Sequence, residues 1–312
     1  MGDRLLAIHS GALGDVVLFA QFLLAARNPG EPLALVAGGE LARLLGELGV
    51  IDEPLDFAAL PMHDLFTPCG PAPDGPLARR LGRCGRLISC FGANDAAAQA
   101  GLAELTRAVT SLFLPVRPAP ADRRHLLDVW AGQALLAPAA LDRLARPPAW
   151  RVPPALLESG RQALREVGGS GEDAYTVLHV GSGSPAKCWP LERFESLAAA
   201  VAAPAVFVLG HVEVERLGDR VVAGLAGRWP TLVCPSLAVL AGVLAGAARF
   251  VGNDSGAAHL AAAVGAPTLV LFGPSDPAHF SPRGRCVRAL RWPNLADLPV
   301  AQVASLLPGQ IV

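Results

Sequence analysis

The chain has 312 residues, of which 52% are hydrophobic and 17% are charged. This composition is typical of a compact folded protein and excludes an extended disordered chain. The formal net charge of −1 gives no general attraction to nucleic acid, so we expect no nucleic-acid partner. The length exceeds what one ordinary hydrophobic core supports and favours two domains.

The cysteines and the N-terminal residues indicate a cytoplasmic protein. Cysteines at positions 69, 84, 90, 188, 234 and 286 form no Cys-x-x-Cys pair and no metal-binding spacing with histidine, which favours a reducing compartment. The N-terminal residues lack the apolar region of a signal peptide. Apolar runs such as 16–26 are shorter than the roughly 20 residues that span a bilayer.

In the first half, apolar runs typical of strands alternate with helical stretches. We predict strands at 4–9, 33–37 and 86–91, and helices at 16–27, 40–48, 95–112 and 126–136. This alternation predicts a parallel α/β sheet. The proline-rich segment 146–154 is typical of a stiff linker, so we place the domain boundary there, with domains at 1–150 and 151–312.

The second half repeats the same alternation. We predict strands at 176–180, 205–209, 247–251 and 268–272, and helices at 191–202, from about 213, and at 260–264. Two domains of this kind would leave a cleft between the carboxyl ends of their sheets, where ligands bind in such folds.

The loop after the first strand, 11–15, lacks both the GxGxxG dinucleotide fingerprint and the P-loop pattern. Gly11 and Gly14 permit a tight turn, and Asp15 falls where the next helix begins. Its carboxylate is either a helix cap or a general base that takes a proton from a hydroxyl. The residues alone leave both interpretations open.

The loop 181–190 favours phosphate binding. It offers the hydroxyls of Ser182 and Ser184 and Lys187, the one lysine among 26 basic residues. An ammonium is a point charge that suits phosphate oxygens. The alternative, an ordinary surface lysine, is weakened because the chain otherwise uses arginine.

The segment 252–259, GNDSGAAH, leads from a predicted strand into a predicted helix. Such a turn presents free backbone N–H groups and the positive end of the helix dipole, which suit a phosphate. Asp254, Ser255, Gly256 and His259 are candidates for this site. The alternative is that Asp254 or Ser255 only caps the helix and His259 faces solvent. Glu213, after another strand, suits ribose hydroxyls, although an ordinary acid at a helix start explains it almost as well.

Taken together, these segments resemble glycosyltransferase family 9, the ADP-heptose:lipopolysaccharide heptosyltransferases. The resemblance lies in GALGD at 11–15, HVGSGSPAKCWPLERF at 179–194, GNDSGAAH at 252–259 and FGPSDP at 272–277, in the expected order over nearly the whole chain. It implies an α/β fold of GT-B type, with two Rossmann-like parallel-sheet domains facing a cleft. The acceptor would bind in domain 1–150 and the nucleotide sugar in domain 151–312.

The resemblance also implies an inverting transfer of a heptose from ADP-heptose to a lipopolysaccharide-core or other glycan acceptor. It gives Asp15 the role of general base, Lys187 that of a donor phosphate contact, and Glu213 that of a ribose ligand. The remaining residues assigned to the donor are Ser182, Ser184, Asp254, Ser255, Gly256 and His259. Gly11 and Gly14 would lie on the acceptor side.

Two features depart from the family pattern. His179-Val180 stands where many members have His-Pro, and the first domain is not rich in lysine as expected for a protein that handles an anionic glycolipid. Arginines along one predicted helix are the best substitute, unless they form only a solvated face: Arg79, Arg80, Arg83 and Arg86. With them we expect peripheral contact with the cytoplasmic face of the inner membrane.

The chemistry of glycosyl transfer needs a base for the incoming hydroxyl and positive charge for the departing diphosphate. The chain has no Asp-x-Asp pair to hold a metal, and Lys187 with a helix N-terminus can supply the charge instead. We therefore expect no metal and no cofactor besides the ADP-sugar co-substrate. Two alternatives stay open: a GT-B transferase using another nucleotide sugar, and a non-catalytic relative that binds a nucleotide sugar or polysaccharide. The missing GxGxxG argues against a nicotinamide dehydrogenase.

Overall fold

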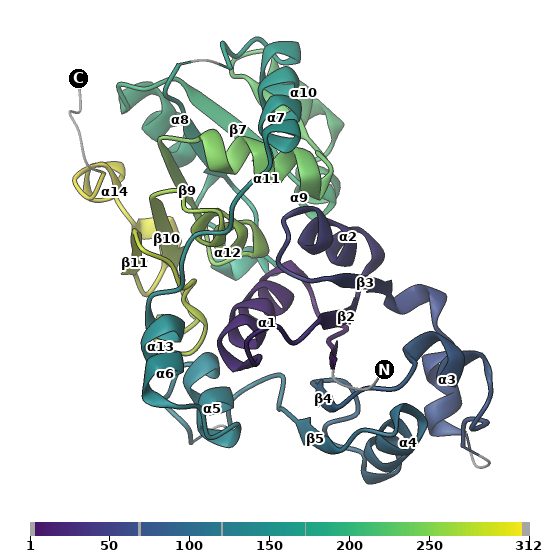
Figure 1. Cartoon of the computed structure of the whole chain (residues 1–312). Helices are drawn as coiled ribbons and strands as arrows, with labels where there is room; N and C mark the ends of the chain where they lie inside the picture. The colour runs from purple at the N-terminus through teal and green to yellow at the C-terminus, as the bar shows by residue number, and fades with distance from the viewer. Residues whose placement is uncertain (1–3, 68–69, 120, 172, 308–312) are drawn as a thin grey trace. The chain divides into compact units, whose positions relative to one another are not determined.

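The computed structural model describes residues 4–67, 70–119, 121–171 and 173–307. The chain divides into two compact units, Met1–Ala145 and Arg146–Val312, and the division falls at the start of the proline-rich segment (Figure 1). Each unit has one parallel sheet with helices between its strands, as the predicted α/β class requires. Cys69 lies outside the described residues.

The first unit has a five-stranded sheet in the order β3-β2-β1-β4-β5. Its strands are β1 (Leu5–Ile8), β2 (Leu33–Ala37), β3 (Glu53–Asp56), β4 (Arg86–Ser89) and β5 (Thr110–Phe113). Its helices are α1 (Leu13–Ala26), α2 (Gly39–Glu47), α3 (Pro76–Leu81), α4 (Ala96–Thr106), α5 (Leu126–Gln133) and α6 (Pro138–Ala145). β1 and β2 are entirely buried, which explains why their sequences are continuous apolar runs rather than alternating ones.

The second unit has a six-stranded sheet in the order β11-β10-β9-β6-β7-β8. Its strands are β6 (Thr176–His179), β7 (Ala205–Leu209), β8 (Thr231–Val233), β9 (Arg249–Asn253), β10 (Thr268–Phe272) and β11 (Val287–Arg291). Its helices are α7 (Pro154–Glu166), α8 (Leu191–Ala200), α9 (His211–Leu217), α10 (Asp219–Ala226), α11 (Leu237–Gly246), α12 (Gly256–Ala263), α13 (Pro277–Phe280) and α14 (Val300–Ala304).

The strand order reverses once in each sheet, between β1 and β4 in the first unit and between β6 and β9 in the second. At such a point the connections leave to opposite sides, so the loops at the carboxyl ends of the two strands diverge and leave a crevice. Two of the three loops singled out in the sequence follow β6 and β9, and the third follows β1. The fold therefore places all three at switch points.

Helices α7 and α11 of the second unit pack closely because glycines face each other across the contact. A Cβ at Gly160 would lie 2.6 Å from the backbone of Gly242, and a Cβ at Gly242 would overlap the carbonyl of Leu156. α7 itself starts at Pro154, at the end of the predicted linker, because proline suits the first position of a helix.

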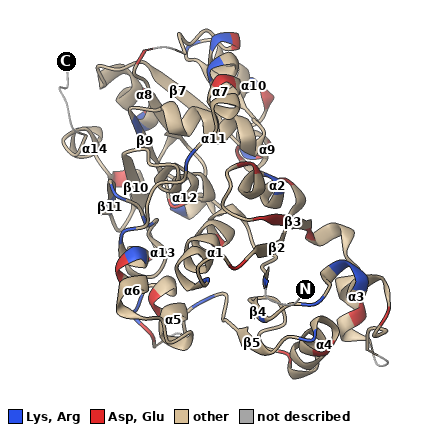
Figure 2. Cartoon of the chain, viewed as in Figure 1, with Lys and Arg blue, Asp and Glu red and all other residues tan. Residues whose placement is uncertain are grey.

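Two predictions about the first unit are wrong. The helix expected at 95–112 ends at Thr106, because Arg107 adopts a left-handed conformation (φ 48°), and 110–113 form strand β5 beside β4. The four arginines do not share a helix. Arg79 and Arg80 lie on α3 (Figure 2), which stops before Gly82 (φ 62°), Arg83 follows in the loop, and Arg86 starts β4.

Among the described residues, no helix combines the length and the apolar character needed to cross a membrane.

Candidate functional site

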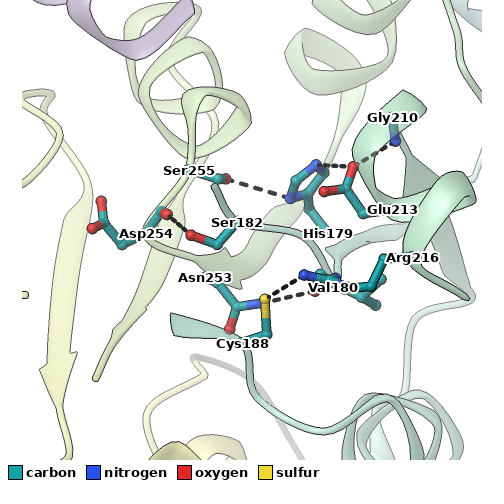
Figure 3. Close-up of polar contacts among 10 residues, drawn as sticks. All are labelled: His179, Val180, Ser182, Cys188, Gly210, Glu213, Arg216, Asn253, Asp254 and Ser255. Carbon is teal, nitrogen blue, oxygen red and sulfur yellow. Dashed lines mark hydrogen bonds and ion pairs between the residues drawn. The ribbon is translucent and has the colours of Figure 1, made fainter. Parts of the chain in front are cut away.

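The site in the second unit is organised by Asn253, the last residue of β9 (Figure 3). Asn253 is fully buried; its Nδ2 donates to the carbonyl of Val180 at 3.0 Å, and its Oδ1 accepts from the backbone N–H of Trp189 at 2.9 Å. One side chain thus fixes both ends of the loop that follows β6. The sequence placed Asn253 in the turn but gave no sign of this structural role.

Lys187 and Asp254 form an ion pair within this loop cluster. Lys187 Nζ lies 2.9 Å from Asp254 Oδ2, which also accepts from the hydroxyl of Ser275 at 2.8 Å. Ser182 Oγ donates to the backbone carbonyl of Asp254 at 2.7 Å. Three side chains, from the loops after β6 and β10, therefore meet around Asp254, which follows β9. The Lys187 side chain stays 34% exposed.

The turn before α12 presents the N-terminus of that helix. Ser255 occupies the N-cap position, but its hydroxyl makes no capping bond; it lies 3.4 Å from His179 Nδ1 instead. The Asp254 carboxylate is engaged by Lys187. The interpretation of Asp254 or Ser255 as a simple cap is therefore wrong, and the helix starts at Gly256 with its first N–H groups directed toward the turn.

Glu213 is buried at the start of α9. Its Oε2 accepts from the backbone N–H of Gly210 at 2.8 Å and lies 3.9 Å from His179 Nε2 (Figure 3). A Cβ at Gly181 would overlap the Glu213 carboxylate, so only glycine fits at the end of β6 beside this acid. Burial lowers the pKa of His179, with the Glu213 charge acting in the opposite direction.

The other predicted donor residues are His259 and Ser184. His259 lies on α12 and is buried, so the expectation that it faces solvent is wrong. Ser184 precedes the short helical turn Pro185–Lys187, and its carbonyl, rather than its hydroxyl, accepts the bonds of that turn.

Arg216 is a site residue that the sequence analysis missed. It lies on α9, three positions after Glu213 and hence on the same side of the helix. Its Nη1 lies 3.0 Å from the Cys188 sulfur and its Nη2 lies 3.5 Å from the carbonyl of Val180. Burial raises the pKa of the Cys188 thiol, which is therefore protonated beside the guanidinium. The helical spacing from Glu213 could have pointed to Arg216.

In the first unit, Asp15 is the third residue of α1, and the N-cap position belongs to Ala12. Asp15 is thus not the helix cap, although its charge suits the first turn. Gly11 donates its N–H to His9 Nδ1 at 2.9 Å, and a Cβ there would overlap the His9 ring. Burial lowers the pKa of His9 to about 4, with the Asp15 charge opposing the shift. Gly14 directly precedes Asp15 in the first turn of α1.

Three of the four acceptor-side arginines are exposed, and the fourth is held in an ion pair. Arg79 and Arg80 are exposed on α3, which packs against α4, and Arg83 is exposed after it. Arg86 pairs with Glu31 at 2.7 Å. Because Arg86 starts β4 and is held by Glu31 of the loop before β2, it does not belong with the other three.

Comparison with known proteins places the chain in a family. Its residues 90–304, more than half of the chain, match Glycosyltransferase family 9 (heptosyltransferase). Lipopolysaccharide heptosyltransferase 1 of Pseudomonas aeruginosa is 51% identical over 75 residues, which are 23% of this chain and 20% of that protein. The alignment therefore spans about a fifth of that curated relative.

Solved structures share the fold over almost the full length. A glycosyl transferase family 9 protein from Veillonella parvula has a TM-score of 0.76 at 19% identity, covering 97% of this chain and 95% of its own. The E. coli ADP-heptose lps heptosyltransferase II has a TM-score of 0.68 at 17% identity, covering 97% and 96%. The E. coli heptosyltransferase WaaC with ADP has a TM-score of 0.65 at 20% identity, covering 97% and 98%. These similarities confirm the predicted GT-B fold class. The chain belongs to glycosyltransferase family 9, the heptosyltransferase family.

Proposed function

We propose that this protein is an inverting glycosyltransferase that moves a heptose from ADP-heptose to a lipopolysaccharide-core or other glycan acceptor. The observation that carries the proposal is the partly exposed side chain of Lys187 beside the turn that leads into α12, at the switch point of the second sheet. The names of the structural relatives support an ADP-linked donor, since one of them is described with ADP and another with ADP-2-deoxy-2-fluoro heptose.

The donor diphosphate would bind to Lys187 and to the first N–H groups of α12, where the helix dipole also favours negative charge. Gly256 allows close approach to the backbone, and Ser182 holds the turn through the carbonyl of Asp254. Glu213 would accept hydrogen bonds from the ribose hydroxyls. Asp254, which holds Lys187, would act by orienting the ammonium.

In the chemical step an acceptor hydroxyl attacks the anomeric carbon of the heptose as the bond from that carbon to the diphosphate oxygen breaks. Asp15 would accept the hydroxyl proton, and the electron pair of the broken bond leaves with ADP. Lys187 and the α12 N-terminus would stabilise the charge that develops on the diphosphate. We expect no metal to be required, because these groups supply the positive charge in place of one.

The acceptor side is assigned to the first unit. Gly11 and Gly14 shape the turn that presents Asp15. The exposed guanidinium groups of Arg79, Arg80 and Arg83 would contact phosphate or carboxylate groups of an anionic glycolipid. Such an acceptor would bring the protein to the cytoplasmic face of the inner membrane as a peripheral protein.

The test is a direct transfer assay. Purified protein, ADP-heptose and heptose-deficient lipopolysaccharide should give a product heavier by one heptose in mass spectrometry, together with one ADP for each transfer. Calorimetric titration with ADP-, UDP- and GDP-sugars identifies the nucleotide. Binding of a UDP- or GDP-sugar alone would favour a different transferase, and tight binding without transfer to any glycan would favour a non-catalytic relative.

A further inference from the structure

A line of three polar side chains crosses the site at the carboxyl end of β6 (Figure 3). His179, the last residue of that strand, lies in the middle. Its Nδ1 is 3.4 Å from the hydroxyl of Ser255, in the turn before α12, and its Nε2 is 3.9 Å from Glu213 Oε2, on α9. One imidazole therefore joins the turn assigned to the diphosphate to the carboxylate assigned to the ribose.

The ring is buried and lies between groups of opposite charge. His179 is buried, and the ring of Phe250 from β9 lies almost parallel to it at 6.4 Å. The charged groups that act on the ring are Glu213 and Arg216 of α9, and a backbone group of Gly181 hydrogen-bonds to it. Burial, reinforced by Arg216, lowers the His179 pKa and is only partly opposed by Glu213 and by the Gly181 backbone, so the ring is neutral at pH 7 before a ligand binds.

The charges around the ring cancel in pairs. Lys187 is paired with Asp254, and the Cys188 thiol is protonated because burial raises its pKa. Arg216 and Glu213 carry opposite charges on one helix. A diphosphate that enters this site therefore adds negative charge to a nearly neutral surrounding, and a nearby negative charge favours the protonated form of an imidazole.

The hydrogen bond between His179 and Ser255 also favours the protonated ring when a phosphate is bound. A neutral imidazole has one N–H and one lone pair. If the N–H is on Nε2 and faces Glu213, then Nδ1 accepts a hydrogen bond from the Ser255 hydroxyl. The hydroxyl hydrogen then points to the ring and not to a ligand. In the imidazolium both nitrogens carry N–H groups: the one on Nε2 faces the Glu213 charge 3.9 Å away, and the one on Nδ1 can donate to Ser255 Oγ. The Ser255 O–H is then free to donate to a phosphate oxygen.

We propose that His179 is a positioning residue that takes up one proton from solvent when the donor diphosphate binds, and thereby turns the Ser255 hydroxyl toward the phosphate. The inference rests on the proposed function, because it needs a nucleotide diphosphate in this site. The proton returns to solvent when the diphosphate leaves. Binding and protonation are reciprocal: the ligand favours the imidazolium to the same extent that the imidazolium favours the ligand.

The affinity for the donor should fall as pH rises. The protonated ring binds the donor more tightly, so affinity is highest below the pKa of the free protein and falls as pH rises toward the pKa of the complex. The fall is limited to about tenfold per pH unit for one linked proton. ADP-heptose is the probe, because its diphosphate is esterified at both ends and lacks the phosphate ionisation near pH 6 that free ADP would add.

The experiment is calorimetric titration with ADP-heptose at pH 6, 7 and 8, in two buffers of different ionisation enthalpy. The wild-type protein should take up a fraction of a proton approaching one, and its affinity should fall with rising pH. His179→Asn should fold, bind without proton uptake and show a flat pH profile. His63→Asn, which removes an exposed histidine of the first unit, is the matched control and should behave as wild type. Glu213→Gln, which removes the counter-charge of the imidazolium, should move the uptake to lower pH and serves if His179→Asn does not fold.

Each failure is distinct. No proton uptake by the wild-type protein, or the same uptake in His179→Asn, overturns the role of His179 while leaving the proposed function intact. No binding of ADP-heptose at any pH overturns the proposed function, and this inference with it.

Discussion

Replacing Lys187 with alanine should weaken the binding of ADP-heptose by about 1.5–3 kcal/mol, the range for a hydrogen bond to a charged group. The Lys187 side chain is 34% exposed, whereas that of Asp254 is only 10% exposed, so the ammonium keeps donors free for a ligand while one is held by Asp254. This free energy corresponds to about tenfold to 150-fold weaker binding.

Asp254 makes the loss larger. Without the ammonium, its nearly buried carboxylate keeps the Ser275 hydroxyl as a partner and lies uncompensated beside the position assigned to the diphosphate. Adding Asp254→Asn to Lys187→Ala removes that charge and should restore part of the affinity.

The ion pair between Lys187 and Asp254 contributes roughly 1 kcal/mol to the free energy of unfolding, because one partner is partly exposed. The melting temperature of Lys187→Ala should therefore fall by about 2–4 °C.

Isothermal titration calorimetry with ADP-heptose measures the affinities, and calorimetric unfolding measures the melting temperatures. Arg228→Ala is the control, because it removes the same charge from an exposed ion pair with Glu195 and should leave donor affinity unchanged. A folded Lys187→Ala protein that binds ADP-heptose as tightly as wild type would remove Lys187 from the donor site.

Three further outcomes are expected. Asp15→Asn should lower turnover by about 10²–10⁴-fold while donor affinity stays within a few fold, because a base acts in the transition state; steady-state rates above about a tenth of wild type would place the base elsewhere. EDTA should leave most of the transfer activity intact, and complete loss reversed by Mg²⁺ would reveal a metal requirement. Asn253→Ala should destabilise the protein by about 2–4 kcal/mol in chemical unfolding, because it leaves the Val180 carbonyl and the Trp189 N–H without their partner; an unchanged midpoint would contradict its structural role.

The sequence by itself determined the α/β class and the positions of its central strands. β2, β7 and β10 begin and end at the predicted residues, because each is a buried apolar run bounded by Gly or Pro. The three glycine-rich loops were also predictable, since each directly follows such a run. Local composition is enough here because a strand buried on both faces consists mostly of apolar residues.

The short edge strands and the ends of helices were not predictable in this way. β3 and β11 are largely exposed and mixed in composition, so they lack an apolar signal, and β5 was taken for the end of a helix. The arginines from position 79 to 86 were assigned to one helix because their spacing is helical. Only the left-handed conformation at Gly82 and the pairing of β4 with β1 decide that the chain turns there.

The contacts of the candidate site depended on the tertiary structure alone. Lys187 and Asp254 are 67 positions apart, and Ser255 and His179 are 76 apart. The sequence indicated which side chains could serve a phosphate, but not that Asp254 would hold the lysine or that His179 would lie between Ser255 and Glu213. Those partners are set by the adjacency of β6 to β9 and to β7, and contacts between segments that follow neighbouring strands leave no periodic trace in either segment.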